Sequence, residues 1–322
     1  MTMNKMHDNK FVEAIKKGER VLILPHILPD GDTIGSALAL FLALKKMGKE
    51  PWILLDDDIP YNLRSLPVQY IVREINPIMK LDTVIGIDCS DLSRLGSRSQ
   101  YIHSAELSVN IDHHITNTLF ADINIVDHQA AATGEIIYSL IHAMGVALDC
   151  EIATCLYTAI STDTGSFKYS NTTSKTHEIA ADLLRNGIRL NEITTELYQN
   201  KPSYQIKLLS TVLNTLEFHY QGQLATLHVT ENMLRNTGAS TSDTDGLIEY
   251  ARDIKGVEVA ILLKELKPGE IKIGLRSKYH IDVSKIAGEF GGGGHSKASG
   301  CTIHGSIDDA KNKLLSVLKD RL

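Results

Sequence analysis

The sequence predicts an α/β protein with two domains: an N-terminal domain on a parallel, Rossmann-like sheet and a smaller C-terminal domain with a mixed sheet. The chain has 322 residues, which exceeds one average domain and suits two. In the first half, short apolar runs alternate with helical patterns, which is typical of strands buried in a parallel sheet. The last third instead contains short strand-like runs around turn residues, which indicates hairpins.

The N-terminal elements follow from continuous apolar runs and from helical spacing of apolar residues. Segment 34–47 is apolar almost all round, which predicts a buried helix that Gly48 can close. The last helix of this half is expected to begin at a Ser174 cap and to end before Gly187. The predicted strands are 21–25, 52–55, 83–87 and 107–111, and the other predicted helices are 131–144, 152–160 and 174–186.

The C-terminal elements are shorter and are separated by turn residues. Lys267-Pro268-Gly269 separates two strand-like runs and predicts a hairpin. We predict a metal-binding domain at 1–188, a helical linker at 189–216 that breaks near Lys201-Pro202, and a second domain at 217–322. In the second domain we expect strands within 216–229, at 257–266 and 270–276 and near 301–304, and helices at 282–290 and 307–322.

Composition limits the functions that the chain can have. The net charge is -6, whereas proteins that bind long nucleic acid normally present a basic face, so a small anion is favoured over long duplex nucleic acid. No apolar run approaches the roughly 18 residues of a membrane span, and the polar N-terminus lacks the apolar core of a signal peptide. The four scattered cysteines show no Cys-x-x-Cys spacing, which disfavours a zinc knuckle. We expect reduced thiols and a cytoplasmic location.

Acidic and histidine side chains follow the first predicted strand. His26, Asp30 and Asp32 lie there, and ligands of open parallel sheets gather at the carboxyl ends of strands. Two carboxylates two residues apart can reach two cations about 3.5–4 Å apart, as two-metal hydrolysis requires. A solvated turn in which Asp32 caps the next helix would explain the same residues.

Three later segments repeat this placement. Asp88 ends an apolar strand, where an acid either caps the next helix or binds a metal. Asp112-His113-His114 ends another strand, and one of its histidines can bind a metal while the other donates a proton. Asp163 follows a helix and can bind a metal or form an Asx turn. Together the clusters predict two divalent cations, and oxygen ligands mixed with imidazole favour manganese over zinc.

The C-terminal domain offers groups for an anion. The four glycines at 291–294 leave the backbone free to turn N–H groups towards an anion, and His295 adds a donor. Arg276 ends a predicted strand and offers a planar fork for a phosphate or a carboxylate. The alternative is a flexible linker with a surface arginine, which is unexpected between two elements of one domain. The candidate substrate-binding residues are Arg276, Gly292, Gly293, Gly294 and His295.

In their order and spacing, these motifs resemble those of the DHH phosphoesterase superfamily. The matching residues are His26-x-x-x-Asp30-x-Asp32, Asp88, Asp112-His113-His114 and Asp163. Segment 291–295 resembles the glycine-rich signature of the DHHA1 domain that follows in this superfamily, so the resemblance covers nearly the whole chain. The compact length and Arg276-Ser277-Lys278 resemble the NrnA-like oligoribonucleases, which also remove the 3′-phosphate from 3′-phosphoadenosine 5′-phosphate (pAp).

The resemblance also implies a role for each residue. His26 and Asp30 would hold one manganese ion, and Asp32 and His113 the other. Asp88 and Asp163 would complete or bridge the pair. His114 would act at the scissile phosphate, Asp112 would orient a neighbour, and Arg276, His295 and the glycine backbone would bind the substrate's phosphate. One departure concerns Ile27-Leu28, where family members often carry a polar residue that faces the substrate.

The activity implied by the resemblance is manganese-dependent hydrolysis of short oligoribonucleotides (nanoRNA) to mononucleotides and of pAp to AMP, in a cleft between the domains. An alternative enzyme would cleave cyclic di-AMP or its linear product pApA. A non-catalytic nucleotide sensor is a second alternative, although a sensor would be expected to lose ligand residues that this chain retains. The expected partners are short RNA and small nucleotides, with neither duplex nucleic acid nor a membrane, and a homodimer is compatible with the sequence.

Overall fold

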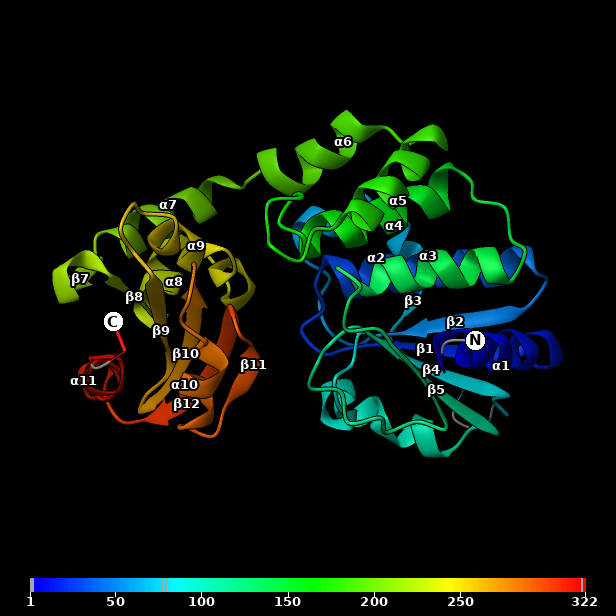
Figure 1. Ribbon diagram of the computed structural model, residues 1–322, viewed down its shortest axis with the longest axis horizontal. Helices are drawn as coiled ribbons and strands as arrows, with labels where there is room; N and C mark the ends of the chain where they lie inside the picture. The colour runs from blue at the N-terminus through cyan, green and yellow to red at the C-terminus, as the bar shows by residue number, and fades with distance from the viewer. Residues whose placement is uncertain (1–2, 77, 79, 320) are drawn as a thin grey trace. The chain divides into compact units, whose positions relative to one another are not determined.

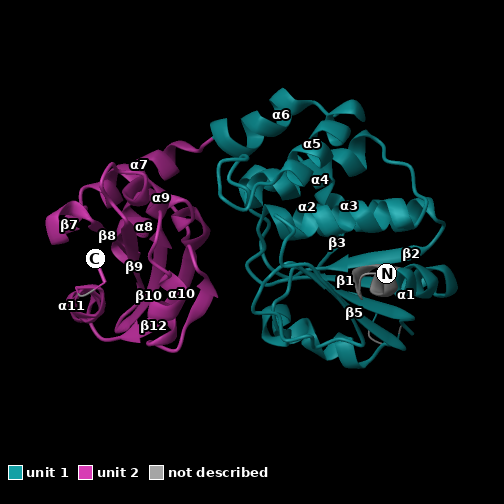
Figure 2. Ribbon diagram, in the orientation of Figure 1, with its two compact units in different colours: residues 1–200 teal, residues 201–322 magenta. Residues whose placement is uncertain are grey.

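The computed structural model describes residues 3–76, 78, 80–319 and 321–322, which fold into two compact units (Figures 1 and 2). Unit 1 is Met1–Asn200 and unit 2 is Lys201–Leu322. Each unit contains a six-stranded sheet, and the predicted α/β class with a parallel and a mixed sheet is confirmed. Within the described ranges, no helix has the length and apolar character that crossing a membrane requires.

Unit 1 is built on a parallel sheet whose strand order is β3-β2-β1-β4-β5-β6. β1 lies between β2 and β4, and its Val21 pairs with Pro51 on one side and with Thr83 on the other. The strand order therefore reverses at the β1–β4 pair, and ligands bind beyond the carboxyl ends of strands at such a point. The strands are β1 (Arg20–Pro25), β2 (Glu50–Leu54), β3 (Ile71–Val72), β4 (Thr83–Ile87), β5 (Leu107–Asp112) and β6 (Ile123–Val126).

Helices cover one face of this sheet, and a 3₁₀ segment covers the other (Figure 1). The helix α2 (Gly31–Lys46) is buried from residue 31 to residue 44 and packs on α3 and α4, as its apolar sequence predicts. On the opposite face, Leu95 and Ile102 of the 3₁₀ segment Leu92–His103 join the cluster around Leu22 and Leu24. The other helices of unit 1 are α1 (Met3–Lys17), α3 (Thr133–Ala143), α4 (Cys150–Asp163), α5 (Ser174–Arg185) and α6 (Leu190–Thr194), which leads into a π-helical turn at Thr195–Gln199.

Two helix caps differ from those that the sequence pattern favours. Asp30, rather than Asp32, caps α2, because its carboxylate accepts a hydrogen bond from the backbone N–H of Thr33 at 3.0 Å. Thr173, rather than Ser174, caps α5 and accepts a bond from the backbone N–H of Thr176. Apolar spacing locates a helix to within a turn but leaves the choice between neighbouring cap residues open.

Unit 2 is built on a mixed sheet whose strand order is β11-β12-β10-β9-β8-β7. β8 and β9 are parallel, and the other neighbours are antiparallel. Gly269 has a φ of +76° in the predicted hairpin turn between β9 and β10. The strands are β7 (Glu217–His219), β8 (Leu224–Thr230), β9 (Val259–Lys267), β10 (Glu270–Ser277), β11 (Gly293–His295) and β12 (Ala298–His304), and the helices are α7 (Ser203–Leu213), α8 (Glu231–Thr237), α9 (Leu247–Arg252), α10 (Val283–Gly288) and α11 (Ile307–Leu318).

Part of the glycine-rich segment is a strand rather than a loop. Gly293–His295 forms β11, which pairs with β12 at the edge of the sheet. The backbone of Gly292 is bonded as well, since its N–H donates to the carbonyl of Ala287 at 2.9 Å. The segment is therefore built into the sheet, and its lack of side chains leaves bare backbone at the sheet edge.

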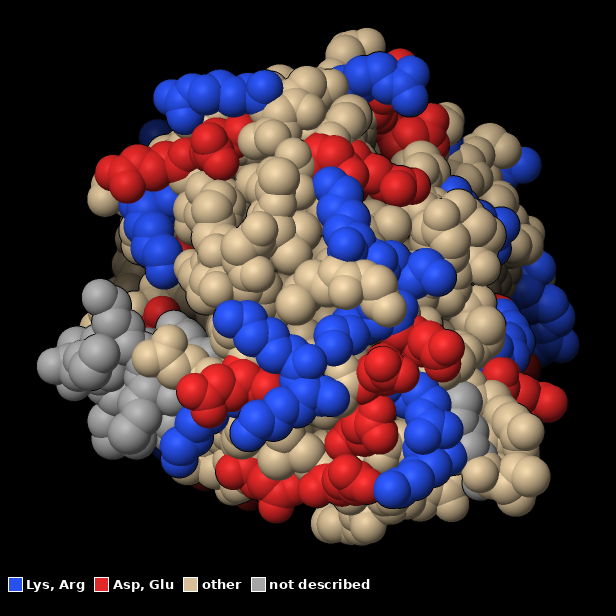
Figure 3. Space-filling model, turned by 90° about the vertical axis from the view of Figure 1, so that its right-hand side faces the viewer, with Lys and Arg blue, Asp and Glu red and all other residues tan. Residues whose placement is uncertain are grey.

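The surface shown in Figure 3 carries charges of both signs. Lysine and arginine side chains lie among aspartate and glutamate side chains across this face. Exposed ion pairs of unit 1, such as Lys80 with Glu106 at 2.6 Å, have the same mixed character. Pairs of this kind contribute little to stability, but they neutralise each other's field.

Candidate metal centre

The predicted site residues of unit 1 meet beyond the carboxyl ends of three neighbouring strands. His26 directly follows β1, Asp88 directly follows β4, and His113 directly follows β5. Asp32 lies in the first turn of α2, and Asp163 is the last residue of α4. The ends of five elements therefore bring the side chains to the place where a parallel sheet of this strand order binds ligands.

The site side chains form three overlapping groups, and within each group one ligand atom per residue lies within 4.8 Å of the others. His26 Nε2 is 3.5 Å from Asp88 Oδ2 and 3.8 Å from Asp30 Oδ1. His113 Nε2 is 3.6 Å from Asp163 Oδ2 and 3.9 Å from Asp32 Oδ2. The groups are His26–Asp30–Asp88, Asp32–His113–Asp163 and Asp88–His113–His114, so the structure brings together every residue that the sequence analysis assigned to metal.

Asp88 links the groups, because its two oxygens face different histidines. Oδ2 faces His26, whereas Oδ1 is 3.7 Å from His113 Nε2 and 3.6 Å from His114 Nδ1. The hydroxyls of Thr33 and Thr133 each donate to one of these oxygens at 2.8 Å. Asp88 has a φ of +60°, in the left-handed region that non-glycine residues rarely adopt. This conformation ends β4 and orients the carboxylate within the site.

The carboxylates of the centre repel one another in the metal-free protein. Asp32 is 1% exposed and accepts bonds from the backbone N–H groups of Thr133 and Gly134, at the start of α3. Burial, followed by the charges of Asp88 and Asp163, raises the pKa of Asp32 well above its usual range. Burial also raises the pKa of Asp163 to about 7, although His113 opposes the shift. Buried carboxylates that resist joint ionisation fit divalent cations, which would neutralise them.

His114 belongs to one of the three groups and is held in place by a buried acid. Its Nδ1 is 2.7 Å from Asp112 Oδ1, and Asp112 is fully buried. Burial disfavours a charged ring, but the bond to Asp112 and the charge of Asp88 raise the pKa of His114 to about 9. In the absence of metal ions the imidazole therefore favours its protonated form at neutral pH, and Asp112 fixes the orientation of the ring.

Some of the residues that hold the site were absent from the sequence prediction. Thr33 and Thr133 anchor Asp88, and Asn117 donates to both Asp112 and the carbonyl of Cys89. Nη2 of Arg94 lies 3.0 Å from His26 Nδ1. The sequence could have indicated Thr133, since it lies near the start of a predicted helix. Nothing in the sequence indicated Arg94, because it comes from the 3₁₀ segment on the opposite face of the sheet.

A glycine permits the close approach of the two helices that carry acidic residues. A Cβ on Gly31 would lie 2.4 Å from Thr162 Oγ1, so any other residue would push the start of α2 away from the end of α4. Asp32 and Asp163 follow directly after these two contact residues. Gly31 therefore keeps both carboxylates within reach of His113.

The predicted anion-binding residues lie together within unit 2. Arg276 on β10 and His295 on β11 both pair with Ala298 of β12, so they occupy one row across the sheet. Arg276 Nε donates to Glu249 Oε1 at 3.2 Å, so part of its guanidinium is already engaged. Gly292, Gly293 and Gly294 lead into His295 at the same edge.

Comparisons with known proteins agree with this arrangement. Residues 20–160 match the model of the DHH family, N-terminal domain, and residues 222–322 match that of the DHHA1 domain. The chain belongs to the DHH family. It is 36% identical over 306 residues to the bifunctional oligoribonuclease and PAP phosphatase NrnA of Thermus thermophilus, covering 94% of this chain and 90% of that protein.

Two further relatives of this DHH-family chain cover nearly all of it. The bifunctional oligoribonuclease and PAP phosphatase NrnA of Bacillus subtilis is 27% identical over 94% of each chain. The crystal structure of an exopolyphosphatase-related protein from Bacteroides fragilis has a TM-score of 0.89 and 26% identity, covering 98% of this chain and 97% of that one. The family predicted from the motifs is thereby confirmed, and the prediction of a phosphoester hydrolase agrees with the names of the relatives.

Proposed function

We propose that this protein is a divalent-metal-dependent phosphoesterase that degrades short oligoribonucleotides to mononucleotides and removes the 3′-phosphate of pAp to give AMP. The observation that carries the proposal is the convergence of Asp30, Asp32, Asp88 and Asp163 with His26 and His113 on one centre. The names of the Thermus thermophilus and Bacillus subtilis relatives support the substrate class.

The metal ligands divide into two sets that share Asp88. His26, Asp30 and one oxygen of Asp88 would hold one ion, while Asp32, His113 and Asp163 would hold the other, with the second oxygen of Asp88 facing it. Oxygen ligands with imidazole favour manganese. Divalent ions bound there would supply Lewis-acid polarisation of the phosphate and would neutralise its charge.

The protonated side chain beside the centre is the natural donor to the leaving oxygen. His114 is held charged by Asp112 and Asp88, and 28% of its side chain is exposed, so it can reach a substrate. We assign His114 as the general acid and Asp112 as the residue that keeps its ring in place. Thr33 and Thr133 hold Asp88 against rotation.

Unit 2 carries positive groups that suit a phosphate. Arg276 and His295 share one row of the sheet, and Gly292–Gly294 leave room for the backbone to approach an anion. We propose that these residues bind a phosphate of the substrate. Glu249 competes with the phosphate for Arg276, so binding requires that ion pair to open or to be shared.

A manganese-supplemented substrate panel tests the proposal. The wild-type protein is expected to release phosphate from pAp and mononucleotides from di- to pentaribonucleotides, and to lose both activities with excess EDTA. The triple variant Asp112→Ala/His113→Ala/His114→Ala serves as the inactive control. Rapid hydrolysis of pApA or cyclic di-AMP with no action on pAp would replace the proposal with the dinucleotide phosphodiesterase. Nucleotide binding without turnover of any compound would indicate a sensor.

A further inference from the structure

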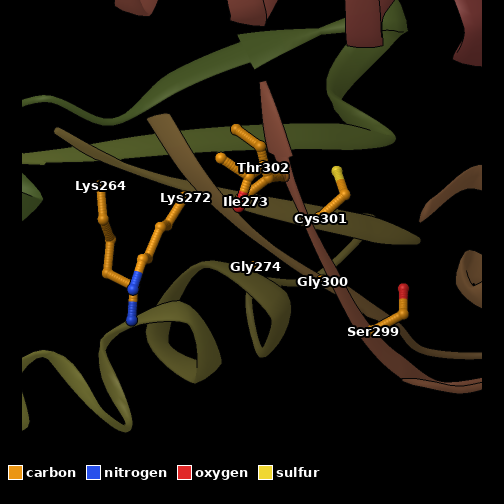
Figure 4. A pocket seen from close by; sticks show the side chains of 8 residues that line it. All are labelled: Lys264, Lys272, Ile273, Gly274, Ser299, Gly300, Cys301 and Thr302. Atoms are coloured by element: carbon orange, nitrogen blue, oxygen red, sulfur yellow. The ribbon is translucent and has the colours of Figure 1, made fainter. Parts of the chain in front are cut away.

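A shallow hollow of about 450 Å³ lies in the sheet of unit 2, outside the residues assigned to substrate so far (Figure 4). Figure 4 shows that the side chains of Lys264 and Lys272 point to the same side of the sheet and converge at their amino ends. The hollow continues over strands β10 and β12. Its lining residues are Lys264, Lys272, Ile273, Gly274, Ser299, Gly300, Cys301 and Thr302.

The strand register puts two lysines directly opposite each other. Lys272 of β10 pairs with Lys264 of β9 on one side and with Thr302 of β12 on the other. Residues directly opposite in an antiparallel pair share a face, and like charges in this position destabilise the sheet. Burial lowers the pKa of Lys264, and Lys272 adds to this shift while Asp245 opposes it. An anion held between the two lysines would offset their repulsion.

The neighbouring row of the same face runs from Leu262 on β9 through three glycines. Gly274 pairs with Gly300, which also pairs with Gly293. A Cβ on Gly274 would meet no atom closer than 3.7 Å, and one on Gly293 would meet none within 4 Å. Neither residue has a positive φ, so neither the packing nor the backbone of unit 2 demands glycine at these positions. Their lack of side chains leaves a floor of bare backbone beside the lysines, which is open at Gly293 and bordered by Ile248 and Leu262 at Gly274.

The floor separates two cationic rows. Lys272 lies two residues before Gly274, and Arg276 lies two residues after it, on the same face of β10. At about 3.4 Å per residue, the two rows are roughly 14 Å apart along the strand, which is more than one phosphate group can span. A ligand that contacts both rows must therefore carry phosphates at separate points along its length.

We propose that Lys264, Lys272 and Thr302 bind a phosphodiester of a single-stranded oligoribonucleotide, at least two nucleotides away from the phosphate bound by Arg276. The intervening nucleotides lie across the glycine floor. This inference rests on the proposed function and deepens it, since it assigns a subsite that a chain of three or more nucleotides fills and that pAp is too short to need.

The test compares two double variants that each remove two positive charges from unit 2. Lys264→Gln/Lys272→Gln removes the two lysine charges that line the hollow, whereas Lys255→Gln/Lys313→Gln removes two exposed lysines that do not line it. Binding of a fluorescein-labelled pentaribonucleotide is measured by anisotropy in manganese, with Asp88→Asn in every protein to prevent turnover. Hydrolysis of pAp is measured in the same lysine variants with Asp88 intact.

We expect the first double variant to bind the pentaribonucleotide roughly tenfold more weakly than its control. The slope of log K against log salt should become shallower by about 0.7, since the two lysines share one phosphate and each lost phosphate contact on a single strand removes about 0.7. The KM for pAp should change less than twofold. Equal weakening by the control, or equal weakening of pAp and the pentaribonucleotide, would overturn the inference. A wild-type protein that hydrolyses none of these compounds would refute the proposed function, whereas the binding comparison would still decide the subsite.

Discussion

The centre of unit 1 and the sheet face of unit 2 carry opposite charges in different surroundings. The centre of unit 1 is acidic, largely buried and built from the ends of strands and helices, where each carboxylate has a specific partner. The face of unit 2 is basic, half exposed and built from the middle of strands, with bare glycine between the cations. The first arrangement would fix bound cations in one geometry, whereas the second would allow a flexible polyanion to lie in more than one register. Under the proposed function, unit 1 would carry out the chemistry and unit 2 would contribute to the choice of substrate.

The largest expected effect comes from the residue that links the metal-facing groups. Asp88→Asn keeps the shape of the side chain and tolerates the φ of +60°, since asparagine is also enriched in that region. It removes the negative charge shared by both ligand sets. We expect kcat for pAp in manganese to fall by about 10⁴-fold or more, a loss typical when a unit of catalytic residues is broken.

A matched change at a structural acid provides the control for Asp88. Asp82 accepts bonds from the backbone N–H groups of Glu19 and Arg20 at 2.8 Å, outside the three metal-facing groups. Asp82→Asn should leave kcat within about threefold of wild type, because only neutral hydrogen bonds replace charged ones. A fully active Asp88→Asn protein would show that Asp88 is not required for catalysis. Circular dichroism of both variants distinguishes a loss of activity from misfolding.

The next effect separates the proton donor from the residue that positions it. His114→Gln should lower kcat by about 10²–10³-fold with little change in KM, because general-acid catalysis contributes about 10²–10⁴-fold. Asp112→Asn should lower kcat by about 10–100-fold and should move the basic limb of the pH–rate profile to lower pH, since Asp112 helps to raise the pKa of His114 to about 9. If Asp112→Asn lowers kcat but leaves the pH–rate profile unchanged, the role of Asp112 is merely structural.

Much of the centre could be predicted because parallel strands have a fixed direction. Once His26, Asp88 and His113 follow three such strands, their convergence at one edge is dictated by topology. The partners of Asp88 could not be predicted in the same way. Thr33 and Thr133 reach it through the packing of α2 and α3, and the φ of Asp88 reflects tertiary constraint rather than a local preference.

The face of unit 2 was less accessible to sequence reasoning because strand register decides it. The sequence analysis expected the glycines at 291–294 to turn N–H groups towards an anion and predicted no strand there, but pairing with β12 makes Gly293–His295 an edge strand. The pairing of Lys264 with Lys272 also depends on register, and the pairing shifts between Glu270 and Ile271. A slip of one residue in the register would put the lysines on the opposite face of the sheet. The alternation of polar and apolar residues therefore cannot by itself predict that the two lysines lie side by side.

A smaller effect is expected on the KM for pAp, through residues of unit 2, rather than on kcat. Arg276→Ala should raise the KM for pAp about tenfold or more with a modest change in kcat, because a forked phosphate contact is lost. Glu249→Gln should act in the opposite direction, since Glu249 holds Arg276 Nε at 3.2 Å in the absence of substrate. Steady-state kinetics of both variants measure this balance. If both changes raise KM equally, the ion pair positions Arg276 rather than competing with the phosphate.

The smallest effect is one on stability, and it tests whether the acidic centre is strained without metal. The folded pKa of Asp163 is raised to about 7, above the unfolded value of about 3.9, so the folded state binds more protons between these values. Stability in EDTA should therefore fall as the pH rises from 5 to 8, and Asp32 shifts in the same direction. We expect the Tm to fall by about 2–4 °C for each kcal/mol lost in a unit of this size, by scanning calorimetry.

The variant Asp163→Asn identifies the source of that pH dependence. It removes one of the carboxylates that resist ionisation, so its Tm in EDTA should decline less steeply with pH than that of the wild type. Added manganese should raise the wild-type Tm, and more so at pH 8 than at pH 5, because ionised carboxylates bind the cations that neutralise them. The same slope in both proteins would place the pH dependence elsewhere in the chain. A wild-type Tm that rises with pH in EDTA would show that the centre carries no such strain, and that its hydrogen bonds alone accommodate the charge.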